Sequence, residues 1–269
     1  RLSPGSCAGY RRVAGRLRTL LAPLALVLAR TEADGKRFAG LNVPEERIAV
    51  SGNVKYDLEA DPRVLDWEDE VRRVAGDRPV LIAGSTMEGE ETQVLDALAS
   101  LGADGTMPFL ILAPRHPERF DAVAQLLGDR GLVFSRRSSA DAVPPDSDVF
   151  LIDTIGELGR AYRLATVAFV GGSLVATGGH NPLEPAVWGV PVLSGPHVFN
   201  FAEVYDEMTD AGGARLVADS AELRVALAAW LDEPEFAVAA GMAGREVVER
   251  NRGATERTVS ALVELVQRV

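Results

Sequence analysis

Polar residues and glycines directly follow four apolar, strand-like stretches of this sequence. Ligands of open parallel sheets bind beyond the carboxyl ends of the strands, so these residues are candidates for a single binding site. Their guanidinium, hydroxyl, amide and unhindered glycine backbone groups suit an anion such as a phosphate or a carboxylate. The candidates are Ser85, Thr86, Arg115, His116, Gly156, Glu157, Gly171, Gly172, Ser173, Asn181 and Glu184.

The stretch 169–186, FVGGSLVATGGHNPLEPA, combines two glycine pairs with the start of a helix. Glycine permits positive φ and has no Cβ, so a ligand can approach its backbone closely. Asn181 is predicted to cap the helix, with Pro182 at the first helical position and Glu184 completing a capping box. We expect this helix end to bind a phosphate or a carboxylate, although capping alone also explains Asn181 and Glu184.

Several residues whose side chains could bind a ligand also have an ordinary structural explanation. Arg115 and His116 stand between two prolines. They are suited to pairing with an anion or stacking on a base, or alternatively to forming a rigid surface turn. Trp67, Trp188 and Trp230 stand among apolar neighbours, which predicts packing rather than ligand stacking.

Other kinds of site lack their sequence patterns. No GxGxxG follows a strand, and neither GxxxxGK[ST] nor GxSxG is present, which disfavours NAD, P-loop and Ser-His-Asp sites. His116, His180 and His197 lack the spacing of a zinc site, so we expect no metal and no cofactor. The net charge of −11 argues against general nucleic-acid binding, because such binding must neutralise many phosphates.

The elements that must position the candidates form a regular α/β pattern. Near-continuous Val, Ile and Leu runs alternate with amphipathic helical stretches, which predicts a Rossmann-like, doubly wound parallel sheet with helices on both faces. Only the third and fourth runs are joined by a loop instead of a helix. The predicted strands are 79–85, 108–115, 132–136, 148–154, 167–173, 190–196 and 214–218.

The chain is predicted to contain one complete α/β domain and the tail of another. Residues 1–58 would hold two strands, over 24–30 and 47–57, with helices over 11–25 and 31–41. So few βα units cannot close a core of their own, which favours a fragment of a preceding domain. The predicted division is 1–58 for this tail, 59–76 for a linker, 77–235 for the complete domain and 236–269 for C-terminal helices.

Charge is unevenly distributed along the sequence. Residues 1–37 carry a net charge of +6, so the rest of the chain carries −17. A basic segment of this kind suits anionic lipid or a phosphorylated substrate, and a solvated arginine-rich helix explains it equally well. Cys7 has no partner for an internal disulfide, which indicates a reducing compartment.

Five motifs together resemble the 3-deoxy-D-manno-octulosonic acid (Kdo) transferases. The resemblance implies the GT-B fold, in which two Rossmann-like domains face a cleft, with the nucleotide-sugar donor in the C-terminal domain. It also implies a bacterial glycosyltransferase of lipopolysaccharide synthesis that transfers Kdo from CMP-Kdo to the lipid A precursor. The motifs are GNVKYD (52–57), AGSTMEGEE (83–91), LAPRHPERF (112–120), DTIGEL (153–158) and the stretch 169–186.

The resemblance assigns the candidates to the CMP-Kdo donor, the first four of them to the cytosine and phosphate. Arg115 and His116 are expected near the cytosine and the phosphate. Ser85 and Thr86 lie where a loop at a strand end is expected to approach the phosphate.

The remaining candidates are assigned to the base, the ribose and the phosphate. Gly156 and Glu157 fall in the loop expected to line the base. Residues 171–173 are expected to face the donor, and Asn181 and Glu184 to bind the ribose or the phosphate from the helix start.

Two positions depart from the pattern of the family. Met87 stands where members commonly have histidine, which removes a titratable donor near the expected phosphate. Ala176 stands where members commonly have proline, which loosens the glycine-rich loop without removing a functional group.

The resemblance places the general base of the reaction, a glutamate, and the membrane anchor in an N-terminal segment that this sequence lacks. No catalytic residue is therefore assigned, and we expect the chain alone to bind CMP-Kdo without transferring the sugar. The full-length protein is expected at the cytoplasmic face of the bacterial inner membrane. The alternatives are another GT-B sugar-nucleotide enzyme, such as a UDP-sugar transferase or epimerase, and a non-catalytic nucleotide-sugar binding module.

Overall fold

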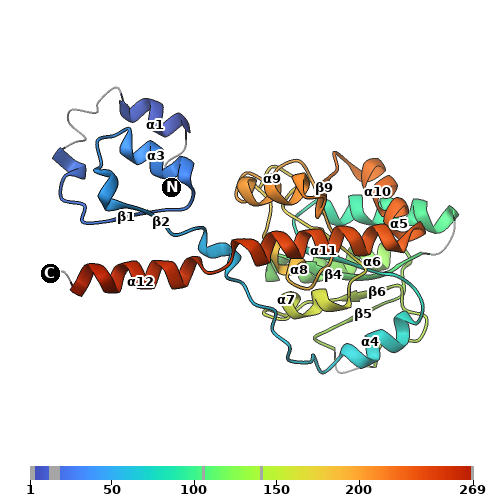
Figure 1. Cartoon of the computed structure of the whole chain (residues 1–269). Coiled ribbons are helices and arrows are strands. Elements are labelled where there is room, and N and C mark those ends of the chain that lie inside the picture. The colour runs from blue at the N-terminus through green and yellow to red at the C-terminus, as the bar shows by residue number, and fades with distance from the viewer. Residues whose placement is uncertain (1–3, 12–18, 105–106, 140–141, 268–269) are drawn as a thin grey trace. The chain divides into compact units, whose positions relative to one another are not determined.

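The computed structural model of the chain describes residues 4–11, 19–104, 107–139 and 142–267. The chain divides into a smaller unit, Arg1–Asp57 with Val248–Val269, and a larger unit, Leu58–Val247 (Figure 1). Seven residues of the helix predicted over 11–25, residues 12–18, lie outside the described residues.

The smaller unit contains a pair of parallel strands joined by a helix. Strand β1 (Val27–Ala29) pairs with β2 (Ile48–Val50), and α3 (Glu32–Ala39) connects them, capped by the Thr31 side chain. Among its described residues it also contains α1 (Pro4–Arg11), the 3-10 turns η1 (Glu45–Arg47) and η2 (Val54–Tyr56), and α12 (Ala254–Gln267).

The second strand predicted for the smaller unit is shorter than expected. It ends at Val50 instead of continuing to residue 57, because the backbone turns at Gly52, whose φ is +92°. The side chain of Asn53 then accepts the Lys55 N–H at 3.2 Å and starts η2. The motif GNVKYD is therefore a turn and not the end of a strand.

A parallel sheet forms the centre of the larger unit, and it confirms the seven predicted strands. The strand order among the described residues is β5-β6-β4-β3-β7-β8-β9, with every neighbouring pair parallel. Chain order reverses on either side of β3, which creates the crevice where open α/β sheets bind ligands. The strands are β3 (Val80–Thr86), β4 (Phe109–Pro114), β5 (Phe134–Arg136), β6 (Val149–Leu151), β7 (Val167–Val170), β8 (Val192–Ser194) and β9 (Ala214–Leu216).

Helices cover both faces of this sheet because successive strand residues point to opposite sides. Leu81 and Ala83 lie in a core packed against α5, α6 and α10, whereas Ile82 between them lies in a second core with α4. The helices and 3-10 turns after β3 are α5 (Glu90–Asp104), η3 (Pro117–Arg119), α6 (Phe120–Asp129), α7 (Leu158–Ala161), η4 (Tyr162–Leu164), α8 (Leu183–Ala186), α9 (Ala202–Asp210), α10 (Ser220–Asp232) and α11 (Pro234–Asn251).

The segment 59–76, predicted as a linker, contains helix α4 (Glu68–Ala75). Leu65 and Trp67, just before this helix, are buried in the second core. The segment therefore packs as part of the larger unit rather than as a bare connection.

Candidate functional site

A cavity of about 350 Å³ lies beyond the carboxyl ends of β3, β4, β6 and β7. This volume is at the lower end of the range of about 300–1,000 Å³ for small-molecule sites. Five of the eleven predicted residues line it, from four loops that the sequence separates widely. These five are Ser85, Arg115, Gly156, Asn181 and Glu184.

Ser85 reaches the cavity because the end of β3 is irregular. Its φ is +55°, and the pairing of β3 with β4 shifts register between Gly84 and Thr86. Ser85 therefore lines the cavity, whereas Thr86 is fully buried and donates its hydroxyl to the Glu91 carboxylate at 2.7 Å. Thr86 thus supports the loop from behind.

The glycine-rich loop after β7 binds a carboxylate of the protein itself. Fully buried Glu90 accepts the N–H groups of Gly172, Ser173 and Leu174 at 2.7–2.8 Å, and that of Met87 at 2.8 Å. These N–H groups are therefore already occupied, and residues 171–173 do not line the cavity.

Ser173 and Gly171 have structural partners as well. The Ser173 hydroxyl donates to the Val170 carbonyl and accepts the Gly195 N–H, both at 2.8 Å. A Cβ at Gly171 would lie 2.6 Å from the carbonyl oxygen of Ser85, so only glycine lets these backbones approach this closely.

The helix start at Asn181 differs from the predicted capping box. Helix α8 begins at Leu183, which places Pro182 at the capping position instead of the first helical position. The Asn181 side chain accepts the Leu183 N–H at 3.2 Å, and its amide lies 3.5 Å from Glu184 Oε1. With only four residues, α8 supplies a small dipole, so the polar side chains here matter more than the helix end.

Burial perturbs two titratable groups of the cavity. It raises the pKa of Glu184, although the Asn181 amide and the Arg115 charge act in the opposite direction. Burial also lowers the pKa of His180, and the charges of Arg115 and His116 add to that effect. Opposite shifts driven by desolvation are typical of ligand sites.

Two further residues predicted for the site have other surroundings. His116 lies 3.9 Å from Glu118 and does not line the cavity. Glu157 does not line the cavity and accepts hydrogen bonds from Trp67 and Arg137. The sequence pattern places both residues beside the site, but only the fold sets the directions of their side chains.

Sequence reasoning missed several cavity residues, including Thr154, Ile155, His180 and Phe201. The sequence does mark Thr154 and Ile155, because they stand at the end of the strand predicted over 148–154, directly before Gly156 and Glu157. Nothing local marks Phe201, which reaches the cavity from the loop after β8.

The described residues contain neither a cluster of metal-ligating side chains nor a membrane-spanning helix. No group of three or more His, Cys, Asp or Glu side chains there is placed to hold a metal ion. Within the same residues, no helix has both the length and the apolar character needed to cross a membrane.

A family model described as 3-deoxy-D-manno-octulosonic-acid transferase (kdotransferase) matches residues 1–58. A 3-deoxy-D-manno-octulosonic acid transferase of Haemophilus influenzae is 39% identical over 270 residues, covering 100% of this chain and 63% of its own length. A transferase of the same name from Bordetella pertussis is 39% identical over 256 residues, covering 91% of this chain and 58% of its own. The chain belongs to the Kdo transferase family.

A solved structure is similar to this Kdo transferase family member. The C-terminal CMP-Kdo binding domain of WaaA from Acinetobacter baumannii shares 35% identity with a TM-score of 0.61, covering 67% of this chain and 98% of that domain. The UDP complex of Staphylococcus aureus MnaA is similar in fold alone, with a TM-score of 0.59 at 14% identity. The chain thus has the α/β fold of GT-B proteins. It spans about 60% of the length of the Haemophilus influenzae and Bordetella pertussis transferases.

Proposed function

We propose that this chain is the donor-binding portion of an enzyme that transfers Kdo from CMP-Kdo to the lipid A precursor in lipopolysaccharide synthesis. The observation that carries this proposal is the cavity at the switch point of the sheet, where Arg115 meets Ser85, Asn181 and Glu184. The similarity to a CMP-Kdo binding domain supports CMP-Kdo as its ligand.

Each cavity side chain has a chemical role in this proposal. The exposed guanidinium of Arg115 pairs with the phosphate of CMP, since arginine forms strong charge-assisted bonds to phosphate oxygens. The Ser85 hydroxyl adds a donor to the phosphate. Asn181 and Glu184 bind the ribose hydroxyls, because an amide and a carboxylate together both donate and accept.

The proposed reaction is an inverting displacement. An acceptor hydroxyl oxygen attacks the anomeric carbon of Kdo, a new C–O bond forms, and the bond to the phosphate oxygen of CMP breaks. The hydroxyl proton passes to a carboxylate base, and the leaving phosphate keeps the electron pair of the broken bond. Arg115 stabilises the negative charge that develops on this phosphate.

In this proposal, the 269 residues alone bind the donor without transferring the sugar, because Glu184, the carboxylate that lines the cavity, is assigned to the ribose and no cavity residue is assigned the role of the base. Incubation of the chain with CMP-Kdo and lipid A precursor should therefore release no more CMP than a buffer control. Transfer by the isolated chain would contradict this part of the proposal.

The acceptor side of the proposal rests on charge. Residues 1–37 carry the excess of +6, which suits phosphates of the lipid A precursor at the cytoplasmic face of the inner membrane. Two of these cations, Arg30 and Arg37, pair with buried Asp34 at 3.7 and 2.6 Å. The remaining basic residues would supply the lipid contact.

Calorimetry with CMP tests the donor site. We expect the wild-type chain to bind CMP, and Arg115→Ala to bind at least about tenfold more weakly, because it loses a charge-assisted hydrogen bond. Arg215→Ala, which removes an exposed arginine from β9, is the matched control and should bind like wild type. When CMP and UDP compete for the chain, CMP should displace UDP, which separates a CMP-Kdo site from that of a UDP-sugar enzyme. Absence of CMP binding, or an Arg115→Ala variant that binds normally, would overturn the donor site.

A further inference from the structure

The loop 154–159 forms one wall of the cavity and carries an unusual apolar residue. Ile155 lines the cavity and is 80% exposed, and Gly156 beside it has φ +93°. A short exposed loop held only by its ends would be mobile. The cavity wall therefore needs support from behind if it is to hold a ligand in one geometry.

Glu157 provides a support on the side away from the cavity. Its side chain is only 13% exposed and accepts the Arg137 Nε–H at 3.1 and 3.2 Å with its two oxygens. The Trp67 indole N–H donates to the same carboxylate at 3.3 Å, and the Thr154 hydroxyl donates to it from within the loop. All these donors compete with any ligand for the carboxylate oxygens.

The donors are themselves fixed in the larger unit. Trp67 is 5% exposed and packs on Phe150 of β6, with ring centroids 4.7 Å apart. Arg137 also donates to Asp66 at 2.9 and 3.1 Å. Two adjacent residues just before α4 thus hold Glu157: Trp67 directly, and Asp66 through Arg137.

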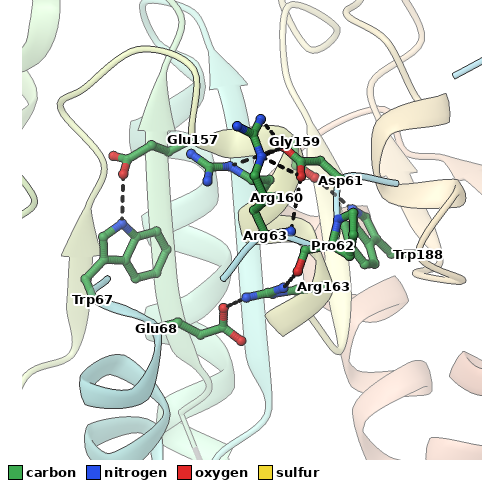
Figure 2. Close-up of polar contacts among 10 residues, drawn as sticks. All are labelled: Asp61, Pro62, Arg63, Trp67, Glu68, Glu157, Gly159, Arg160, Arg163 and Trp188. Atoms are coloured by element: carbon green, nitrogen blue, oxygen red, sulfur yellow. Dashed lines mark hydrogen bonds and ion pairs between the residues drawn. The ribbon is translucent and has the colours of Figure 1, made fainter. Parts of the chain in front are cut away.

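Helix α7 and turn η4, which continue the loop, are held by the same segment (Figure 2). Arg163 donates to the Pro62 carbonyl at 3.1 Å and pairs with buried Glu68. On the other side, the Trp188 indole donates to the carbonyl of Gly159, a cavity residue, at 2.7 Å. Both tryptophans therefore do more than pack, since each ends in a hydrogen bond to this wall.

We propose that Glu157 is a positioning residue rather than a ligand contact: with Trp67 and Arg137 it holds the loop that presents Ile155 and Gly156 to the cytosine of the bound nucleotide. This inference rests on the proposed donor site. It assigns segment 61–68, outside the cavity, a role in nucleotide affinity.

The sign of the change in CMP affinity separates a positioning role of Glu157 from a purely electrostatic effect of its charge. Removal of a negative charge near a phosphate-binding cavity strengthens binding of an anion by electrostatics alone. Loss of a positioning group weakens the same binding, because the loop must then be ordered when the ligand binds. Glu157→Ala therefore gives opposite results under the two explanations.

The experiment measures CMP affinity of the full chain by calorimetry for Glu157→Ala, Trp67→Phe and the double variant. We expect about tenfold weaker binding for Glu157→Ala and about threefold for Trp67→Phe, which keeps an aromatic ring but loses the indole N–H. In the Glu157→Ala background, Trp67→Phe should cause no further loss. Trp230→Phe, which alters a tryptophan packed against the first core, is the control and should bind like wild type.

Methyl NMR of isoleucine gives an independent readout. Saturating CMP should shift the Ile155 methyl signal of the wild type upfield through the ring current of the base. Ribose 5-phosphate, which lacks the base, should not. In Glu157→Ala saturated with CMP, the shift should be reduced, which a general loss of stability would not produce.

The outcomes separate the two proposals. A wild-type chain that binds no CMP overturns the donor site itself. If the wild type binds CMP while Glu157→Ala and Trp67→Phe bind equally or more tightly, only the positioning role is overturned. A loss from Trp67→Phe that persists in the Glu157→Ala background also overturns it, because the indole would then act independently of Glu157.

Discussion

The loop 171–174 after β7 and the loop 154–159 after β6 lie at the same carboxyl edge of the sheet, yet only the second opens to the cavity. The first is rich in glycine and resembles an anion-binding loop, but Glu90 occupies its N–H groups. The second has its acidic residue, Glu157, turned outward to Trp67 and Arg137. Its cavity side remains available to a ligand.

The difference shows that a glycine-rich turn alone does not identify a ligand loop. Buried N–H groups require an acceptor, and a buried carboxylate of the protein satisfies them permanently. Such a loop serves as a rigid frame for its neighbours. A ligand then binds at the part of the edge where polar groups of the protein are not already hydrogen-bonded to a buried carboxylate.

The largest expected effect is that of Glu90→Gln, which breaks the frame. The amide presents its own N–H groups to backbone donors, so buried N–H groups lose their acceptor, and we expect a loss of about 3 kcal/mol in the free energy of unfolding. Urea denaturation measures it. Glu88→Gln, at an exposed position two residues away, is the matched control and should change stability little. Equal stability of both variants would contradict the framing role of Glu90.

Glycine substitutions sharpen the comparison between the loops. Gly171→Ala brings a Cβ within 2.6–2.7 Å of backbone atoms of Ser85 and Thr86, so we expect a loss of about 2 kcal/mol or more. Gly156→Ala meets open space and has only its positive φ to accommodate, which costs about 1 kcal/mol. Thermal denaturation of the two variants compares these losses. The reverse order would show that the cavity loop, and not the glycine-rich loop, is the more tightly packed.

Neutralising Asp153 and neutralising Glu184 should change the free energy of unfolding in opposite directions. Burial raises the pKa of Asp153, but hydrogen bonds from Ser138 and Arg136 outweigh it, so the pKa is lowered overall. Its stabilisation is present above about pH 4 and lost as pH falls through the lowered pKa. We therefore expect Asp153→Asn to destabilise the fold at pH 7 by about 2 kcal/mol, and less at pH 3.

For Glu184 the sign is reversed and the effect is smaller. Burial raises its pKa, so the charged form is less favourable in the folded state than in the unfolded state, and this penalty is present at pH 7, above the unfolded-state pKa. Glu184→Gln should raise the free energy of unfolding at pH 7, and the gain should vanish below about pH 4, where the carboxyl is protonated in both states. Denaturation curves at the two pH values test this. A destabilised Glu184→Gln variant would show that the carboxylate contributes to folding rather than to binding.

The sequence by itself determined the succession of strands and helices from β3 onward in the larger unit, and that several strand ends meet at one edge of the sheet. Uninterrupted Val, Ile and Leu runs form buried parallel strands wherever helices separate them, so each strand can be recognised from a short stretch of sequence. The same runs place Ser85, Arg115 and Gly156 at one edge of the sheet, where the structure confirms a cavity. The five motifs together also identified the family.

Only the tertiary structure decided which side chains at this edge face the cavity. Glu90 reaches the loop after β7 across 82 residues of sequence, and Trp67 reaches Glu157 across 90. The direction of a side chain after a strand depends on the partners that packing brings to it, and no local pattern encodes partners at such separations. The sequence therefore specified the edge of the sheet at which the cavity lies, and the packing of distant residues decided which loops of that edge line the cavity and which support it.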